Sequence, residues 1–143
     1  MRKLINVLLI DDDPQSNFIA TSLLKGLEIT KDIKIAVNGH EGLDFILQKP
    51  STGVFNSPEL IILDRKMPVM DAEEFIEALQ NLAFVNRKDI VILLISNHLN
   101  DKIIETFRDL GVEEFALKPL TSERISNIYD KYFRLEQGSI AVG

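Results

Sequence analysis

The sequence contains no cysteine and only two histidines among its 143 residues. The absence of cysteine excludes a disulfide scaffold, a zinc–thiolate site and a cysteine nucleophile, and we therefore expect a cytoplasmic protein. Long hydrophobic runs are also absent. The longest uninterrupted one, residues 90–95, is far shorter than the roughly 20 residues that cross a bilayer, so no membrane insertion is expected.

Basic residues are fewer than acidic ones. The 16 lysines and arginines against 22 aspartates and glutamates give a formal net charge of −6, which argues against direct nucleic-acid binding and favours a cation or a basic partner. The chain has the length of one domain, and its 45% hydrophobic content is enough for a core. We expect a single domain over residues 1–135 and a flexible tail over residues 136–143, which lack periodicity.

Short apolar runs of β type alternate along the chain with longer segments whose apolar residues recur at helical spacing. This alternation predicts an α/β fold with a parallel sheet between helices. Three of the runs are continuously apolar, as strands covered on both faces should be. Strands are expected at residues 5–10, 33–37, 60–63, 90–95 and 113–117.

Residues typical of helix N-caps stand before the predicted helices, namely Asp13, Asn38, Asp71 and Thr121. Pro14 suits a first helical position, and Glu41 has capping-box spacing from Asn38. The fourth helix is expected over residues 101–110, ending before Gly111. The fifth is expected to reach Leu135 and to turn inward Ile125, Ile128, Tyr129 and Tyr132. Residues 49–58, rich in proline, serine and glycine, are predicted to form a surface loop.

Polar residues follow four of the five predicted strands as a coherent set. In an open parallel sheet, ligands bind beyond the carboxyl ends of the strands, so these positions are candidate functional residues. If the first and third strands are neighbours, carboxylates from both meet in one pocket, and their repulsion requires a cation. The set comprises Asp11, Asp12 and Asp13, then Asp64, Ser96, Lys118 and Pro119.

Clustered carboxylates without a nearby histidine or cysteine suit Mg²⁺, or Mn²⁺ as an alternative, better than zinc or copper. Lys118 adds a positive charge and Ser96 a hydroxyl donor. Together with a carboxylate nucleophile, these groups are sufficient to bind and transfer a phosphoryl group. Each signal alone is weak, because a run of aspartates before a helix is usually a cap. Their joint occurrence at the right strand ends favours a site.

Four segments resemble, in order and at the right intervals, the signatures of the receiver domain of bacterial response regulators. They are residues 8–14, 60–71, 93–96 and 115–119, and the resemblance covers residues 8–133. It implies a flavodoxin-like (βα)5 fold whose five-stranded parallel sheet has the order 2-1-3-4-5. It also implies a CheY-like, stand-alone receiver of two-component or phosphorelay signalling, which is a switch and not an enzyme beyond assisting its own phosphorylation and dephosphorylation.

The resemblance implies a role for each residue of the site. Asp64 is similar to the phosphoacceptor, which takes a phosphoryl group from a phosphohistidine on a sensor histidine kinase or a histidine phosphotransfer protein. Asp11 and Asp12, with Asp64 and the backbone carbonyl of Lys66, would hold Mg²⁺. The remaining positions are similar to the switch hydroxyl, the phosphate-pairing lysine and the switch aromatic residue, which are Ser96, Lys118 and Phe115.

The resemblance also implies how such a protein signals. The output would be a changed affinity for a downstream protein through the fourth helix, fifth strand and fifth helix, with homodimerisation left open. The bond before Pro119 is cis in the family. Tyr132 and Phe133 are adjacent and cannot both point into the core, so one of them is a candidate partner contact, with ordinary packing as the alternative.

Four residues depart from the family pattern or vary within it. Ala72 replaces a glycine, which predicts backbone strain if a positive φ is kept there. Asn97 replaces a small residue and would narrow access to Asp64. Lys66 and His98 lie at positions that tune the phosphoryl lifetime, and we hypothesise that a basic residue there contacts the phosphoryl group.

Three other functions fit the sequence less well than a receiver does. A phosphatase with an aspartyl nucleophile would carry a second aspartate where Lys66 stands, and would need a cap for its substrate. A nonphosphorylated interaction module would be expected to have lost a site residue. A flavin or dinucleotide site is disfavoured because no G-x-G-x-x-G turn or P-loop follows a strand.

Overall fold

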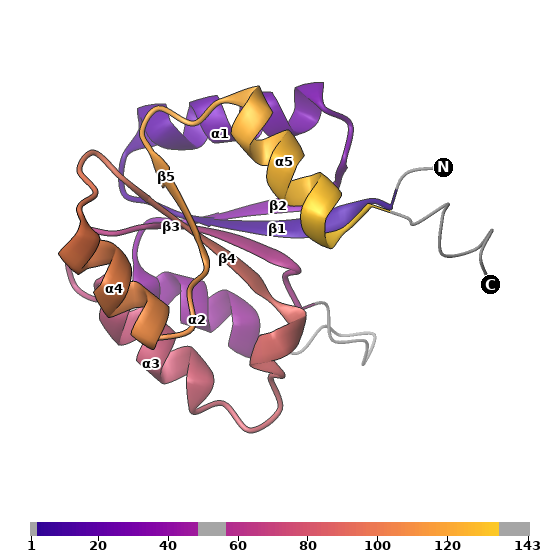
Figure 1. Ribbon diagram of the computed structural model, residues 1–143. Coiled ribbons are helices and arrows are strands. Elements are labelled where there is room, and N and C mark those ends of the chain that lie inside the picture. The colour runs from indigo at the N-terminus through magenta and orange to yellow at the C-terminus, as the bar shows by residue number, and fades with distance from the viewer. Residues whose placement is uncertain (1–2, 49–56, 135–143) are drawn as a thin grey trace, which may run out of the picture.

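The computed structural model describes residues 3–48 and 57–134. A parallel sheet of five strands in the order β2-β1-β3-β4-β5 forms its middle layer (Figure 1). The strands are β1 Ile5–Ile10, β2 Thr30–Ala36, β3 Leu60–Asp64, β4 Val91–Ser96 and β5 Glu114–Leu117. The helices are α1 Pro14–Gly26, α2 Gly39–Leu47, α3 Ala72–Gln80, α4 Asp101–Asp109 and α5 Ser122–Tyr132, and a short 3-10 helix spans Arg87–Asp89. The predicted fold class and strand order are confirmed.

Helices cover both faces of the sheet. Helices α1 and α5 lie on one face, and α2, α3 and α4 lie on the other (Figure 1). In β1, Val7 and Leu9 point into the core beneath α1 and α5, while Leu8 and Ile10 point into the core on the opposite face. A strand alternates its side chains between faces, so burial on both faces explains the continuous apolar run.

Only β1 has the predicted bounds; β3 ends and β5 begins one residue later than predicted, and β2 and β4 differ at both ends. Strand β2 begins at Thr30 and not at residue 33, and Lys31, Asp32 and Lys34 along it are exposed. β2 is an edge strand, so polar residues are tolerated there and conceal the strand pattern. Strand β4 is shifted by one residue and ends at Ser96, which brings that hydroxyl into the sheet.

The predicted N-caps are present. Asp13, Asn38, Asp71 and Thr121 each accept a hydrogen bond from a backbone N–H in the first turn of their helix. The complete capping box is at Asp71 and Glu74. The Asn38 box is only half formed, because the Glu41 carboxylate accepts from the backbone of Val37 instead. Helix α4 ends at Asp109, one residue earlier than predicted.

The end of α5 corrects two predictions. The helix stops at Tyr132 and does not reach Leu135, because Phe133 leaves the helical conformation. Phe133, rather than Tyr132, completes the buried set with Ile125, Ile128 and Tyr129. Tyr132 is half-buried, and its hydroxyl donates to the Glu114 carboxylate, so both adjacent aromatic residues make intramolecular contacts.

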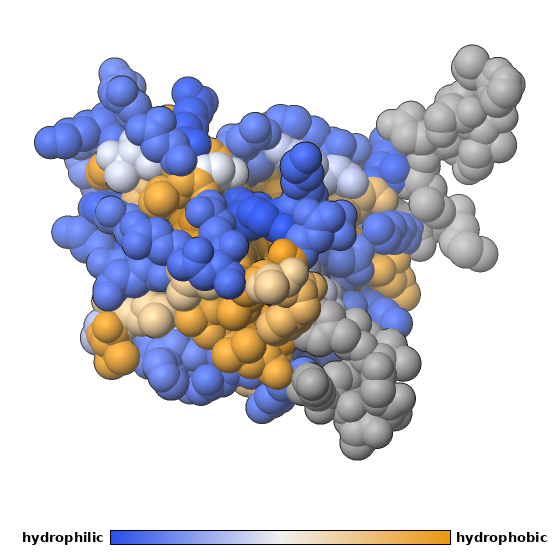
Figure 2. Space-filling model, turned by 90° about the horizontal axis from the view of Figure 1, so that it is seen from below, coloured by the Kyte–Doolittle hydropathy of each residue, from blue (hydrophilic) through white to orange (hydrophobic). Residues whose placement is uncertain are grey.

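Figure 2 views the molecule from the side of α2 and α3, where hydrophilic residues surround an apolar area. Leu47, at the end of α2, and Phe84, after α3, are exposed hydrophobic residues. The predicted tail and most of the predicted loop over residues 49–58 lie outside the described residues. Within residues 3–48 and 57–134, no helix has the length and apolarity needed to cross a bilayer.

Candidate functional site

Asp11, Asp64 and Lys118 meet at the carboxyl ends of three strands. Asp11 follows β1 and Asp64 ends β3, and the pairing of Ile10 with Leu63 places these two ends side by side. Lys118 Nζ lies 2.9 Å from Asp11 Oδ2 and 3.3 Å from Asp64 Oδ1. The three side chains expose only 3%, 9% and 12% of their surface. The structure therefore brings together three groups that the sequence places far apart.

Asp12 completes a cluster of carboxylates. One oxygen from each of Asp11, Asp12 and Asp64 lies within 4.8 Å of the others, with Asp12 exposed and the other two buried. Lys118 balances only one of the three negative charges, so the cluster keeps an excess of negative charge that a divalent cation would neutralise. Carboxylate oxygens are ligands that Mg²⁺ prefers. The donor set therefore fits the predicted magnesium site.

The environment of Asp64 makes its charge costly. Burial first, and then the negative charge of Asp11, raise the pKa of Asp64 from 3.8 to about 6, although Lys118 acts in the opposite direction. Burial alone would lower the pKa of Lys118, but its hydrogen bond to Asp11 and the charges of Asp11 and Asp64 raise it. At neutral pH the lysine is therefore charged and Asp64 is mostly ionised, as a nucleophile requires.

Asn17 fixes the turn that presents Asp11, and the sequence reasoning did not identify it. Its buried amide donates to the backbone carbonyl of Asp11 at 2.8 Å, while Asp11 Oδ1 accepts from the backbone of Asp13 at 2.9 Å. These bonds hold the β1–α1 turn and leave Asp11 Oδ2 for Lys118. The signal available in the sequence was that Asn17 is a polar residue on the inward face of a predicted helix.

Ser96 lies at the end of β4 and is held from two sides. Its Oγ accepts from the backbone N–H of His98 at 3.2 Å and from Arg65 Nε at 3.3 Å. Arg65 was also missed, although it directly follows the candidate nucleophile. The backbone N–H of Lys118 donates to the Ser96 carbonyl at 2.9 Å, so Ser96 also sets the position of the lysine.

Comparison with protein-family models decides the family. The model of the response regulator receiver domain matches residues 7–130. The chain belongs to this family.

Relatives of this receiver domain span different architectures. The probable C4-dicarboxylate response regulator DctR of Bacillus subtilis is 28% identical over 141 residues, which are 95% of this chain but 55% of that protein. The chain thus spans about half the length of that relative. The two-component response regulator ORR41 of Oryza sativa subsp. japonica is 24% identical, and the alignment covers 92% of this chain and 96% of that protein.

A solved structure shares the fold. The two-component response regulator from Cytophaga hutchinsonii superimposes with a TM-score of 0.82 at 24% identity, covering 92% of this receiver domain and 98% of that chain.

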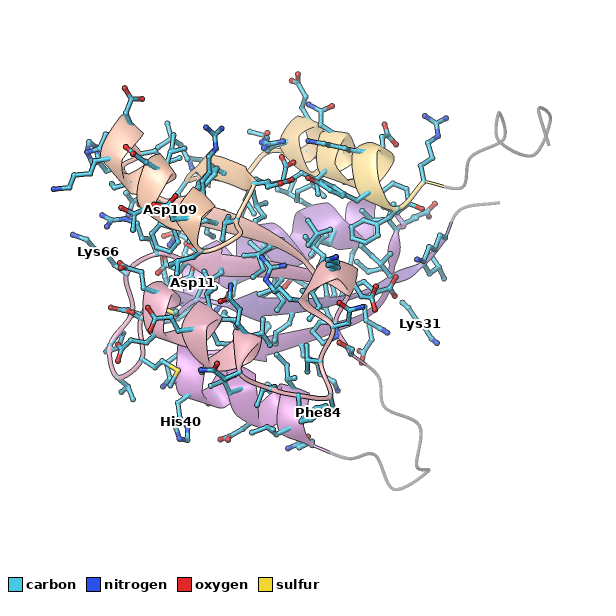
Figure 3. The ribbon with its side chains drawn as sticks, turned by 60° about the horizontal axis from the view of Figure 1, so that its bottom comes forward. Asp11, Lys31, His40, Lys66, Phe84 and Asp109 are labelled. Carbon is cyan, nitrogen blue, oxygen red and sulfur yellow. The ribbon has the colours of Figure 1, made fainter. Side chains whose placement is uncertain are left out.

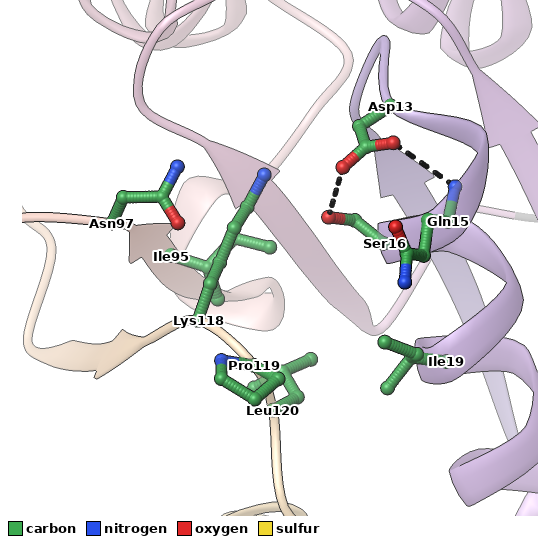
Figure 4. A pocket seen from close by; sticks show the side chains of 9 residues that line it. All are labelled: Asp13, Gln15, Ser16, Ile19, Ile95, Asn97, Lys118, Pro119 and Leu120. Atoms are coloured by element: carbon green, nitrogen blue, oxygen red, sulfur yellow. Dashed lines mark hydrogen bonds between the residues drawn. The ribbon is translucent and has the colours of Figure 1, made fainter.

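Lys66, Asn97 and His98, three of the positions singled out in the sequence, have exposed side chains. Lys66 projects outward at the end of the sheet where Asp11 lies (Figure 3). The side chain of His98 is exposed, with Nε2 3.3 Å from the amide nitrogen of Asn100. Asn97 lines a pocket into which Lys118 projects, with Asp13 across from it (Figure 4). Of these three described residues, Asn97 is thus the one that shares this pocket with Lys118.

The backbone strain that the sequence predicted at Ala72 is found at Val69 instead. Ala72 is fully buried as the first residue of α3 and has no positive φ. Val69, earlier in the same loop, adopts a φ of 72°. Positive φ is costly for a β-branched residue, so the loop that follows Asp64 carries backbone strain at this position.

Phe115, the receiver's candidate switch aromatic, is half-buried on β5 and contacts two helices. The guanidinium carbon of Arg108, on α4, lies 6.0 Å from the centre of its ring. Arg124, on α5, donates to its backbone carbonyl through Nε and Nη2, both at 3.2 Å. The bond between Lys118 and Pro119 is cis, as the resemblance implied.

Proposed function

We propose that Asp64 accepts a phosphoryl group from a phosphohistidine of a sensor histidine kinase or a histidine phosphotransfer protein. The observation that carries the proposal is the placement of a mostly ionised Asp64 beside Asp11, Asp12 and Lys118. An oxygen of Asp64 attacks the phosphorus, the phosphorus–nitrogen bond breaks, and the imidazole leaves with the bonding electron pair. The product is an aspartyl phosphate on this chain.

The neighbouring residues have distinct tasks in this reaction. Lys118, 3.3 Å from Asp64, pairs with an oxygen of the transferred group. A bound Mg²⁺, held by Asp11, Asp12, Asp64 and the backbone carbonyl of Lys66, would neutralise charge on the phosphoryl oxygens. Asn17 and the Asp13 backbone keep Asp11 oriented.

Phosphorylation then changes affinity for a downstream protein. Ser96 moves toward a phosphoryl oxygen, and Phe115 fills the vacated space, which is a shift between two states. The ring of Phe115 lies beside Arg108 of α4, and Arg124 of α5 bonds its backbone carbonyl, so a movement of the ring would first alter the surface at α4 and β5, next to α5. This surface is the proposed partner site.

Intact-mass measurement tests the proposal. The protein is incubated with Mg²⁺ and acetyl phosphate, and we expect one acid-labile phosphoryl group on the wild type and none on Asp64→Asn. Asp109→Asn, which changes an exposed aspartate on α4, serves as the matched control and should be labelled like the wild type. If neither the wild type nor the control gains a phosphoryl group although Mg²⁺ is bound, the chain is an inert interaction module. Steady release of phosphate from phosphomonoesters would instead identify a phosphatase.

A further inference from the structure

Arg65 connects the candidate phosphoacceptor with the candidate switch hydroxyl. It follows Asp64 directly, and its Nε donates to Ser96 Oγ at 3.3 Å. Its backbone N–H donates to the carbonyl of Ile95 at 2.9 Å, so main chain and side chain both join the end of β3 to the end of β4. Ser96 is 5% exposed and Arg65 is half-buried, which limits replacement of this bond by water.

The Arg65 bond uses the last acceptor position of the hydroxyl. A serine oxygen accepts two hydrogen bonds and donates one. The backbone N–H of His98 takes one acceptor position, and Arg65 Nε takes the other. The His98 bond lies within the turn after β4, whereas the Arg65 bond comes from another strand. Displacement of Ser96 toward a group on Asp64 therefore strains or breaks the Arg65 bond.

We propose that Arg65 is a positioning residue that holds Ser96 in its unphosphorylated position and thereby sets how readily the receiver switches. The inference rests on the proposed function, in which Ser96 moves toward a phosphoryl oxygen. A hydrogen bond from a charged donor is stronger than a neutral one, and it favours one position of the hydroxyl. The phosphoryl group interacts better with the displaced hydroxyl, so part of its interaction energy is used to break the Arg65 bond. The apparent affinity of the receiver for a phosphoryl group or its analogue is therefore lower.

Two substitutions separate the hydrogen bond of Arg65 from its charge. Glutamine carries an N–H donor at the same number of bonds from Cα as arginine Nε, but it has no charge. Lysine keeps the positive charge and has a methylene group at that position. Arg65→Gln therefore keeps a neutral donor at the position of Nε, and Arg65→Lys keeps the charge with its donors one bond farther out. Arg65→Met removes both while filling similar space.

The first experiment needs no metal or phosphoryl donor. Urea unfolding in EDTA measures a double-mutant cycle between Arg65→Met and Ser96→Ala. We expect Arg65→Met to lower the free energy of unfolding more in the wild-type background than in Ser96→Ala, while Arg65→Gln has an intermediate effect. Additive effects of the two substitutions would overturn the proposed bond.

The second experiment measures the affinity for beryllium fluoride, used as a stable phosphoryl analogue with Mg²⁺. Arg65→Met is expected to bind it about threefold to tenfold more tightly than the wild type, and Arg65→Gln by a smaller factor, because a neutral donor holds Ser96 less strongly than a charged one. Ser96→Ala should abolish these differences. Unchanged binding by Arg65→Met would overturn the proposal. Weaker binding by Arg65→Met and Arg65→Gln, but not by Arg65→Lys, would instead indicate that the charge of Arg65 contacts the phosphoryl group directly. If the wild type binds no better than Asp64→Asn, the proposed function fails, whereas the unfolding cycle still tests the bond.

Discussion

Asp64 is the residue at which stability and function conflict most directly. A buried carboxylate beside Asp11 is destabilising while it carries a charge, and Lys118 offsets only part of that cost. In the proposed function, this crowded carboxylate is the group that would hold a cation and accept a phosphoryl group. Val69, with its positive φ, adds backbone strain to the loop that follows Asp64. The site is therefore maintained by the rest of the fold.

We predict that Asp64→Asn raises stability in the absence of divalent cations. The pKa of Asp64 is raised from 3.8 to about 6, so the native state binds this proton more readily than the unfolded state. The cost of the charge is complete above about pH 6 and disappears as the pH falls to about 4. Urea unfolding in EDTA should show a gain of about 1–3 kcal/mol near neutral pH that shrinks with acidification. A variant less stable than the wild type at neutral pH would contradict this.

Among the secondary-structure elements, α5 is tied to β5 by one buried carboxylate. Glu114 accepts from Arg124 Nη2 at 2.9 Å and from Lys131 Nζ at 2.8 Å, and also from the Tyr132 hydroxyl. Burial would raise the pKa of Glu114, but hydrogen bonds from Lys131, Tyr132 and Arg124 lower it to about 2. Because Arg124 also holds the carbonyl of Phe115, this cluster connects α5 to the candidate switch residue.

We predict that Glu114→Gln lowers the free energy of unfolding by about 1–3 kcal/mol at neutral pH. The folded pKa lies below the usual 4.5, so this stabilisation is present above about pH 4.5 and is lost as the pH falls toward 2. The difference between wild type and variant should accordingly be smaller near pH 3. Glu113→Gln, at the exposed neighbour, is the control and should change stability little. An equal difference at both pH values would refute the assignment.

On the scale of the whole molecule, one sheet separates two cores and carries the site at a single end. The core of α1 and α5 includes Leu24, and the core of α2, α3 and α4 includes Phe75, both fully buried. Asp11 and Lys66 lie at the opposite end of the molecule from Lys31 and Phe84 (Figure 3). A cation held by the acidic cluster would join β1 to β3, and its binding would then affect the stability of the entire domain.

We predict that Mg²⁺ raises the melting temperature of the wild type in a concentration-dependent manner. A ligand that binds only the native state stabilises it by about 2.7 kcal/mol at a hundredfold excess over Kd. Differential scanning calorimetry should show a strongly reduced shift for Asp12→Asn, because Asp12 contributes to the oxygen cluster, and a wild-type shift for Asp109→Asn. Absence of any shift in the wild type would argue against a magnesium site.

Much of the fold and of the site was predictable because local chemistry specifies it. Continuous apolar runs predicted the central strands, and the caps at Asp13, Asn38, Asp71 and Thr121 depend on neighbours within three residues. The convergence of Asp11, Asp64 and Lys118 followed from strand order, because the carboxyl ends of parallel strands share one edge.

Only the tertiary structure decided which side chains complete the site. Arg65 reaches a serine 31 residues away, and Asn17 turns its amide back to Asp11. In the sequence alone, Glu114 is indistinguishable from other polar strand residues. Its buried contacts with Arg124, Lys131 and Tyr132 form only when α5 packs over β5. The sequence by itself determined the alternation of elements and the identity of the acidic residues, because these depend on short-range periodicity. The contacts of long polar side chains depend on where distant backbone segments come to lie, and that is settled only when the cores pack.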